Sequence, residues 1–87
     1  MKNNVVKEKS FAFALRIVKL SKHLNQEKQD YVLSKQLLRS GTAIVALVRE
    51  AEYAESSADF VHKMAITLKE VNETLYWLEL LPIRKLH

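Results

Sequence analysis

Three histidines are the side chains in this 87-residue chain best suited to ligate a metal ion or transfer a proton at neutral pH. Each has at most one carboxylate one helical turn away: His23 is followed by Glu27, His62 is preceded by Asp59, and His87 has none. Two ligands do not hold a metal ion, and no H-E-x-x-H pair is present. The sequence therefore predicts no metal site, and we expect solvated surface histidines.

Two glutamates three residues apart, Glu70 and Glu73, have the spacing of an acid–base pair on one helix face. Their neighbours Lys69 and Asn72 favour an ordinary solvated face instead. Gly41 is the only glycine, which excludes a glycine-rich phosphate loop, and no serine lies in a nucleophile-elbow motif. We therefore predict no catalytic residues, no cofactor and no small-molecule substrate, and a protein that is not an enzyme.

Basic side chains recur along the first half of the chain and form the candidate nucleic-acid-binding residues. Like charges one turn apart, such as Lys35 and Arg39, cost a few tenths of a kcal/mol (~0.3) unless anions offset them. Phosphates would do so, as would acids of a neighbouring subunit such as Glu50, Glu52 and Glu55. A solvated face that gives solubility is the third interpretation. The candidate residues are Arg16, Lys19, Lys22, Lys35 and Arg39.

The charge of the chain is divided unevenly between its halves. Residues 1–49 contain ten Lys or Arg and three acidic residues, which gives a net charge of +7. Residues 50–87 contain four Lys or Arg and seven acidic residues, which gives −3. The two halves together give the formal net charge of +4. Such a dipolar chain presents a basic surface to nucleic acid or pairs its halves between subunits. Composition does not choose between these two outcomes.

The elements that position these residues are predicted to be helices. One Gly, one Pro, no Cys and 48% apolar residues in 87 positions indicate a single all-α domain over 1–87. Helices are expected at about 8–24, 29–54 and 58–81, in an up-down antiparallel bundle. No stretch has the length of a membrane span and no secretory signal is visible, so we expect a soluble, cytoplasmic protein.

Local signals set the expected helix ends. Ser10 or Asn4 is the candidate cap of the first helix, and Ser56 or Ser57 that of the third. Pro82 is predicted to stop the third helix. Within the second helix, the small residues around Gly41 favour close contact with another helix over a break in the helix.

The third helix has two sets of apolar residues. The first recurs at spacings of three and four and is predicted to face the core: Phe60, Met64, Leu68, Val71, Leu75 and Leu78. The second set adds apolar area away from this stripe and is the predicted oligomer interface: Ile66, Tyr76, Trp77, Leu80 and Leu81. Tyr76 and Trp77 are more typical of core or interface anchors than of a base-stacking platform.

Four stretches of the chain, taken together, resemble a known bacterial family. They read SKQLLRSGTAI at 34–44, EA at 50–51, SADFVHKMAITLKE at 57–70 and ETLYWL at 73–78. They resemble the four-helix-bundle proteins encoded in intervening sequences of 23S rRNA genes, formerly labelled a ribosomal protein. The chain is also similar to the accessory variability protein of diversity-generating retroelements. The resemblance implies a bundle that forms a ring-like homopentamer, with nucleic-acid binding suggested for parts of the family and no enzymatic activity established.

The chain departs from this family in two places. Val45-Ala46-Leu47 stands where the family has a Gly-Ala-Asn run, and we expect no fourth helix in the six residues from Pro82 onward, where the family normally continues into one after the Tyr-Trp-Leu segment. The missing helix is expected to leave one long side of the bundle uncovered. A shortened or decaying member with no function of its own is therefore one interpretation.

The leading functional hypothesis is a non-enzymatic helical-bundle assembly protein. It is expected to be homo-oligomeric and to bind RNA or DNA through basic faces of the first two helices. The alternative is a purely structural protein–protein interaction subunit with no nucleic-acid role, whose open groove accepts a helix of another chain.

Overall fold

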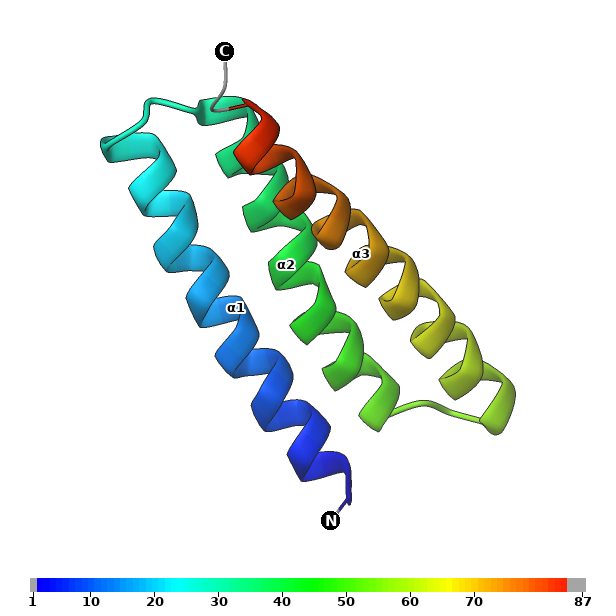
Figure 1. Ribbon diagram of the computed structural model, residues 1–87. Helices are drawn as coiled ribbons and strands as arrows, with labels where there is room; N and C mark the ends of the chain where they lie inside the picture. Colours follow the sequence, from blue (N-terminus) through cyan, green and yellow to red (C-terminus); the bar gives the residue numbers. More distant parts are fainter. Residues whose placement is uncertain (1, 85–87) are drawn as a thin grey trace.

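The computed structural model describes residues 2–84, which form three helices in an up-down-up order (Figure 1). The helices are α1 (Lys2–Gln26), α2 (Tyr31–Glu52) and α3 (Ser57–Arg84). No strand occurs among the described residues. The predicted all-α class and the three antiparallel long helices are confirmed.

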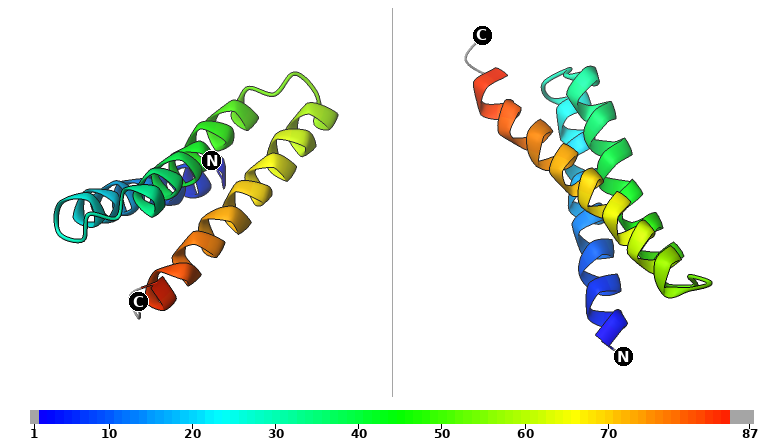
Figure 2. Two further views of the ribbon diagram at one scale, coloured as in Figure 1. Left: turned by 90° about the horizontal axis from the view of Figure 1, so that it is seen from above. Right: turned by 90° about the vertical axis from the view of Figure 1, so that its right-hand side faces the viewer.

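The three helices form an open layer rather than a closed bundle. The helix α2 packs against both α1 and α3, whereas the backbones of α1 and α3 do not come into contact. Figure 2 shows that α3 crosses the α1–α2 pair at an angle. The molecule is accordingly elongated, with extents of 47 × 19 × 16 Å. One face of α2 therefore remains open between its two neighbours.

The contact between α1 and α2 is close because small residues lie in it. A Cβ atom added to Gly41 would lie 2.8 Å from Cγ2 of Ile17, so α1 packs directly on the glycine backbone. Further along the same contact, the hydroxyls of Ser21 and Ser34 are 2.7 Å apart and both buried. The prediction that Gly41 marks a close helix–helix contact is confirmed.

The contact between α2 and α3 is also made by small polar side chains. The hydroxyl of Thr74 donates to Ser40 Oγ at 2.8 Å, and both residues are fully buried. Thr67 is buried as well, and its hydroxyl donates to the carbonyl of Lys63 in its own helix. Leu37 of α2, also fully buried, belongs to the apolar core together with Ile17 and Leu24.

The predicted core stripe of α3 is therefore wrong in large part. Phe60, Leu68 and Leu75 are 43%, 64% and 50% exposed. Thr67 and Thr74 lie about a sixth of a turn around the helix from the centre of this stripe. Their small side chains let α3 approach α2 on the face that carries the two threonines. Periodicity located an apolar face of α3 but not the face that α2 covers.

Helix starts follow the predicted capping chemistry at α3 but not at α1. Ser56 caps α3, because its hydroxyl accepts the backbone N–H of Asp59 at 3.1 Å, while the Asp59 carboxylate accepts the N–H of Glu55 at 3.2 Å. The predicted start of α1 near residue 8 is wrong, since α1 begins at Lys2. Ser10 lies inside that helix, where its hydroxyl donates to the carbonyl of Lys7.

Of the other boundaries, the start of α2 agrees with expectation to within two residues, and the end of α3 differs. Asp30 caps α2 by accepting the backbone N–H of Leu33 at 3.3 Å, so α2 begins at Tyr31. Pro82 does not stop α3, which continues to Arg84. A proline this near the end of a helix removes one backbone donor and leaves few later turns to disturb, so its cost there is small.

Candidate functional site

Lys22 and Lys35 lie at the same level on the same face of the α1–α2 pair. Each directly follows one member of the buried Ser21–Ser34 hydroxyl pair. The next residue of a helix lies about 100° further around the axis. Because the two helices are antiparallel, these rotations carry both lysines to the same side of the pair. Both side chains are exposed, and neither forms an ion pair within residues 2–84.

Arg16 and Lys19 extend this charge around the outside of α1. Arg16, Lys19 and Lys22 are spaced three residues apart, and three residues fall about 60° short of a full helical turn. The three cations therefore cover a sector of about 120° on the surface of α1. All three are exposed and lie on the side away from α2. We call Arg16, Lys19, Lys22 and Lys35 the basic surface.

Arg39, the fifth predicted nucleic-acid-binding residue, pairs with acids of its own chain. Its guanidinium forms ion pairs with Glu70 at 3.5 Å and with Glu73. Glu73 also accepts the indole N–H of Trp77 at 3.2 Å. These contacts join α2 to α3 and explain the Glu70–Glu73 spacing without catalysis. Arg39 therefore differs from the four cations of the basic surface: its charge is paired within the chain, whereas theirs form no ion pair in the described part of the chain.

The ion pair changes the titration of both partners. The hydrogen bond from Arg39, followed by that from Trp77, holds the pKa of Glu73 below its ordinary value of about 4.5. The hydrogen bond to Glu73 in turn raises the pKa of Arg39, and Glu70 adds to this effect. On the same contact, the hydrogen bond to Glu50, at 2.7 Å, raises the pKa of Lys63.

We expect acid to weaken the α2–α3 contact through Glu73. Because the pKa of Glu73 is lower in the folded than in the unfolded state, the unfolded state takes up a proton at this carboxylate first as the pH falls. The ion pair therefore stabilises the fold above about pH 4.5. This stabilisation is lost as the pH falls through the pKa of Glu73 in the folded state. Thermal unfolding followed by circular dichroism should show a smaller acid-induced fall in Tm for Glu73→Gln than for the wild type. The matched control is Glu79→Gln, an exposed glutamate with no ion pair in the described residues. Equal pH profiles for Glu73→Gln and the wild type would contradict this role.

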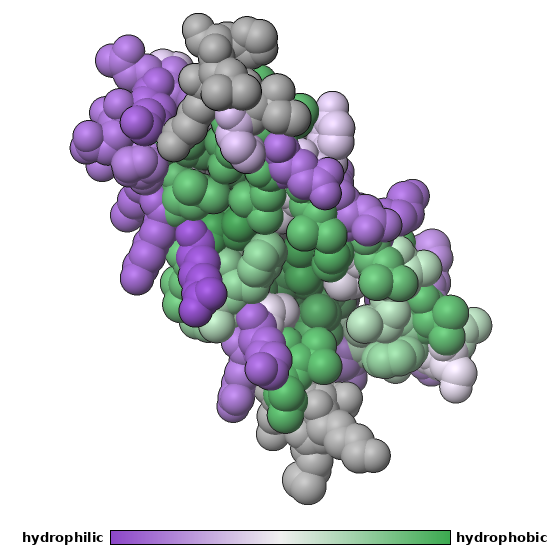
Figure 3. Space-filling view, viewed as in Figure 1, coloured by the Kyte–Doolittle hydropathy of each residue, from purple (hydrophilic) through white to green (hydrophobic). Residues whose placement is uncertain are grey.

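An apolar groove follows the open face of α2, between α1 and α3. Its volume is about 390 Å³. In the space-filling view of Figure 3, a band of hydrophobic side chains runs between α1 and α3, with hydrophilic side chains along the outer edge of α1. The residues that line it are Val6, Lys9, Ser10, Phe13, Ile44, Val48, Met64, Thr67, Val71 and Leu75.

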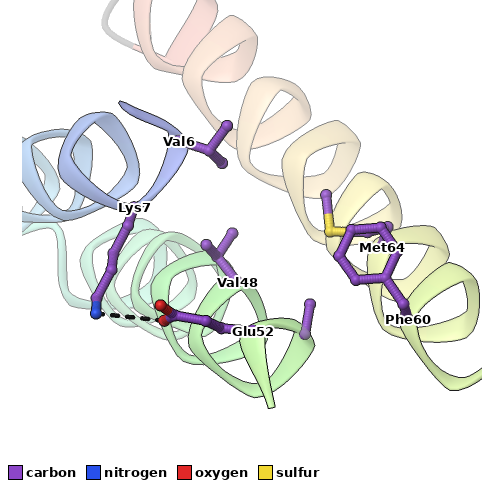
Figure 4. A pocket seen from close by; sticks show the side chains of 7 residues that line it. Val6, Lys7, Val48, Glu52, Phe60 and Met64 are labelled. Carbon is purple, nitrogen blue, oxygen red and sulfur yellow. Dashed lines mark ion pairs between the residues drawn. The ribbon is translucent and has the colours of Figure 1, made fainter. Parts of the chain in front are cut away.

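Figure 4 shows the end of the groove near the α2–α3 connection, where Val6 and Val48 face Met64 and Phe60 across the space between the helices. Beside them, Lys7 and Glu52 form an ion pair of 3.3 Å that joins α1 to α2. Three different helices thus contribute apolar side chains to one open channel. Sequence periodicity predicts that Met64 and Val71 face the core, and the signal it misses is the pair of buried threonines, Thr67 and Thr74, that turns them toward the groove.

The predicted oligomer interface on α3 is divided by the structure. Trp77 and Leu81 pack against the core cluster of their own chain. Tyr76 is half exposed and meets the ring of Trp77 edge-on, with centroids 4.9 Å apart. Ile66 and Leu80 are half-buried. Tyr76 is therefore the member of the set that offers the most surface to another molecule.

A second exposed apolar patch lies on the face that carries Lys22 and Lys35. Phe11, Leu15 and Leu38 are each between 39% and 48% exposed, and the guanidinium of Arg49 lies 5.6 Å from the centre of the Phe11 ring. The spacing of Phe11 and Leu15 is visible in the sequence. Their exposure is not, because it depends on which face of α1 meets α2.

Other candidate chemistry finds no support in the described residues. Within residues 2–84, no three His, Cys, Asp or Glu side chains are grouped as metal ligands would be. Neither is any helix there long and apolar enough to cross a membrane. His87 lies outside the described part of the chain.

Comparison with known proteins adds a family and a solved structure. Residues 2–86 match the sequence profile of the 23S rRNA-intervening sequence protein family. A crystal structure from Bacteroides thetaiotaomicron, described as a protein of unknown function from the S23 ribosomal protein family, is similar with a TM-score of 0.92 and 62% sequence identity. The alignment covers 98% of this chain and 75% of that one. No curated protein matches, and neither description names an enzymatic activity.

Proposed function

Since the chain belongs to the 23S rRNA-intervening sequence protein family, we propose that it is a non-enzymatic, cytoplasmic assembly protein that self-associates and binds RNA or DNA through its basic surface. The observation that carries the proposal is the set of four exposed cations, Arg16, Lys19, Lys22 and Lys35, that form no ion pair in residues 2–84. The Ser21–Ser34 pair fixes the level of two of them on adjacent helices. Arg39 is left out of the proposed phosphate contacts, because its guanidinium is paired with Glu70 and Glu73.

The expected mode of binding is contact with the phosphate backbone. Lysine and arginine side chains on the outside of helices bind phosphates as charges and release condensed counterions. With about four such contacts, the logarithm of the affinity should fall with the logarithm of the salt concentration with a slope between about −2.8 for a single strand and about −3.6 for a duplex. No described element offers a groove-reading helix with polar side chains for bases, so the proposed binding is independent of sequence.

Self-association is proposed to use the outer side of α3. Tyr76 presents half of its surface there, supported by Trp77, which packs against the core. An aromatic side chain held in place by a packed neighbour is typical of an interface anchor. The family resemblance implies a homopentamer.

Binding to a structured RNA hairpin, measured by fluorescence anisotropy at low and high salt, tests the nucleic-acid half. Lys22→Glu combined with Lys35→Glu should weaken binding at low salt about tenfold or more, since each lost phosphate contact is replaced by repulsion. The control is Lys69→Glu, which alters one exposed, unpaired lysine on α3 and should have a smaller effect. Absence of binding at low salt, or equal affinity of the double variant and the wild type, would overturn this half.

Multi-angle light scattering tests the assembly half. The wild type should be larger than a monomer, and Tyr76→Lys should shift it toward the monomer without loss of helicity. An oligomer that binds no RNA at low salt would support the alternative, a purely structural interaction subunit. A folded monomer would contradict self-association.

A further inference from the structure

We propose that the nucleic acid bound by the basic surface is single-stranded, and that its unpaired bases stack on the exposed rings of Phe11 and Tyr31. This inference rests on the proposed function and adds the class of ligand. The residues concerned lie on the face of the α1–α2 pair opposite the apolar groove. Phe13 lines the groove, and Phe11, two residues earlier, lies about 160° away around α1.

One line of exposed side chains on this face runs along α1. Phe11, Leu15 and Lys22 are spaced by four and seven residues, which places them within about 40° of one another around the helix axis. Phe11 is 47% and Leu15 48% exposed, and Lys22 is exposed as well. The line therefore carries a ring, an aliphatic side chain and a cation over a length of about 16 Å.

A second line runs beside it along α2. Tyr31, Lys35 and Leu38 are spaced by four and three residues and lie within about 60° of one another around the helix axis. Tyr31 is 61% and Leu38 39% exposed. Lys22 and Lys35 are at the same level, because each follows one member of the buried serine pair. Tyr31 therefore lies beyond the two lysines at one end of the face, and Phe11 lies at the other end.

The Phe11 end of the face is built to hold a base rather than a phosphate. The guanidinium of Arg49 lies 5.6 Å from the centre of the Phe11 ring, and a hollow of about 290 Å³ beside them is lined by Lys7, Glu8, Phe11 and Arg49. Lys7 is paired with Glu52, so the carboxylate of Glu8 disfavours a phosphate there. An arginine beside an aromatic ring strengthens the binding of a stacked base. The phosphates are accordingly expected at Lys22 and Lys35.

The mixture of rings and cations on this face fits a nucleic acid better than a protein surface. A single strand repeats a charged phosphate and a planar base at every nucleotide, and proteins that bind it combine basic side chains along the backbone with aromatic side chains under the bases. The cores of protein interfaces are depleted of lysine. Here Lys22 and Lys35, which form no ion pair within residues 2–84, lie between the rings of Phe11 and Tyr31.

The exposed apolar side chains favour a single strand over a duplex. In a duplex the faces of the bases cover one another, and the protein meets only base edges, sugars and phosphates. Phe11, Leu15 and Leu38 have no polar side-chain atom, so they would displace water from these groups without replacing its hydrogen bonds. Unpaired bases present their faces, which stack on such side chains.

Fluorescence anisotropy with three fluorescein-labelled RNA probes tests the inference. The probes are a single strand of about 12 nucleotides without self-complementarity, the blunt duplex of the same sequence, and an abasic strand with the same sugars and phosphates. The wild type should bind the single strand more tightly than the duplex. It should also bind the single strand about fivefold or more tightly than the abasic strand, since stacking of one base contributes at least this factor.

Variants of the two rings separate stacking from charge. Phe11→Leu combined with Tyr31→Leu keeps the apolar area and removes both rings, so it should lower the affinity for the single strand to that for the abasic strand. The salt dependence should stay the same, because no cation is altered. The matched control is Phe60→Leu, the same change at a ring on α3 that is 43% exposed, and it should leave all three affinities unchanged. Lys22→Glu with Lys35→Glu should weaken the binding of all three probes.

The outcomes distinguish this inference from the proposed function. If no probe binds at low salt, both are overturned. If the three probes bind equally well, or if the ring variant binds the single strand as the wild type does, the inference fails and binding through the basic surface stands. A lower light-scattering mass of the ring variant without RNA would show that the rings join two copies of the chain, which would also overturn the inference.

Discussion

Replacing Gly41 by Leu is expected to destabilise the fold more than any other single change considered. The added Cβ alone would lie 2.8 Å from Cγ2 and 3.1 Å from Cβ of Ile17, atoms close to the α1 backbone that cannot swing aside. Overpacking of this kind costs about 1–3 kcal/mol and sometimes more. The better helix propensity of Leu returns less than about 1 kcal/mol. Because four heavy atoms enter a closed contact, we expect a net loss of about 3 kcal/mol, or a fall in Tm of more than about 10 °C.

Urea unfolding of Gly41→Leu measures this effect, and Ala46→Leu provides the matched control. Ala46 lies on the same helix at an exposed position, so the same side chain should change stability there by less than about 0.5 kcal/mol. Combining Gly41→Leu with Ile17→Ala should cost less than the sum of the two single changes, because the second removes the atoms that the first meets. Similar midpoints for Gly41→Leu and Ala46→Leu would show that α1 does not pack on the glycine.

Thr74→Val is expected to be the next most damaging change, although it alters neither volume nor shape. It removes the hydroxyl that donates to Ser40 Oγ, and Ser40 is fully buried with no access to water. A buried polar group that loses its partner costs about 1–3 kcal/mol. We therefore expect a loss in this range, measured by urea unfolding with an unchanged m-value.

The double variant Ser40→Ala with Thr74→Val shows whether the hydroxyl pair is the cause. It removes both polar groups, so it should be less destabilised than Thr74→Val plus Ser40→Ala added together. Thr42→Val is the control, since its exposed hydroxyl bonds only the carbonyls of Leu38 and Arg39 in its own helix. Strict additivity of the two single variants would contradict the proposed coupling.

The sequence predicted the three helices and one close contact, but not the faces that meet. Ser56 and Gly41 were informative because capping and close approach each depend on a specific residue type. The α3 stripe misled, since helical periodicity identifies apolar faces without stating which is covered. Thr67 and Thr74 decide that point, and a threonine on a helix gives no sign in the sequence that it is buried.

For the candidate sites too, part of the arrangement could be predicted from the sequence and part could not. The candidate cations were visible as a cluster in the sequence, and Arg16, Lys19, Lys22 and Lys35 are exposed in the structure, while their binding of nucleic acid stays a prediction. The engagement of Arg39 was not visible, because its partners Glu70 and Glu73 lie more than thirty residues away. An uncovered side of the bundle was expected, but its position between α1 and α3 follows from the packing of the threonines.

The central place of α2 also has a consequence for how the chain folds. Close backbone contacts join α1 to α2 and α2 to α3, so in the described part of the chain they lie within the two helical hairpins. Such local topology gives a low contact order, which is typical of domains that fold rapidly. Both hairpins contain α2. Either hairpin can therefore form first, and the remaining helix then packs against the α2 of that hairpin.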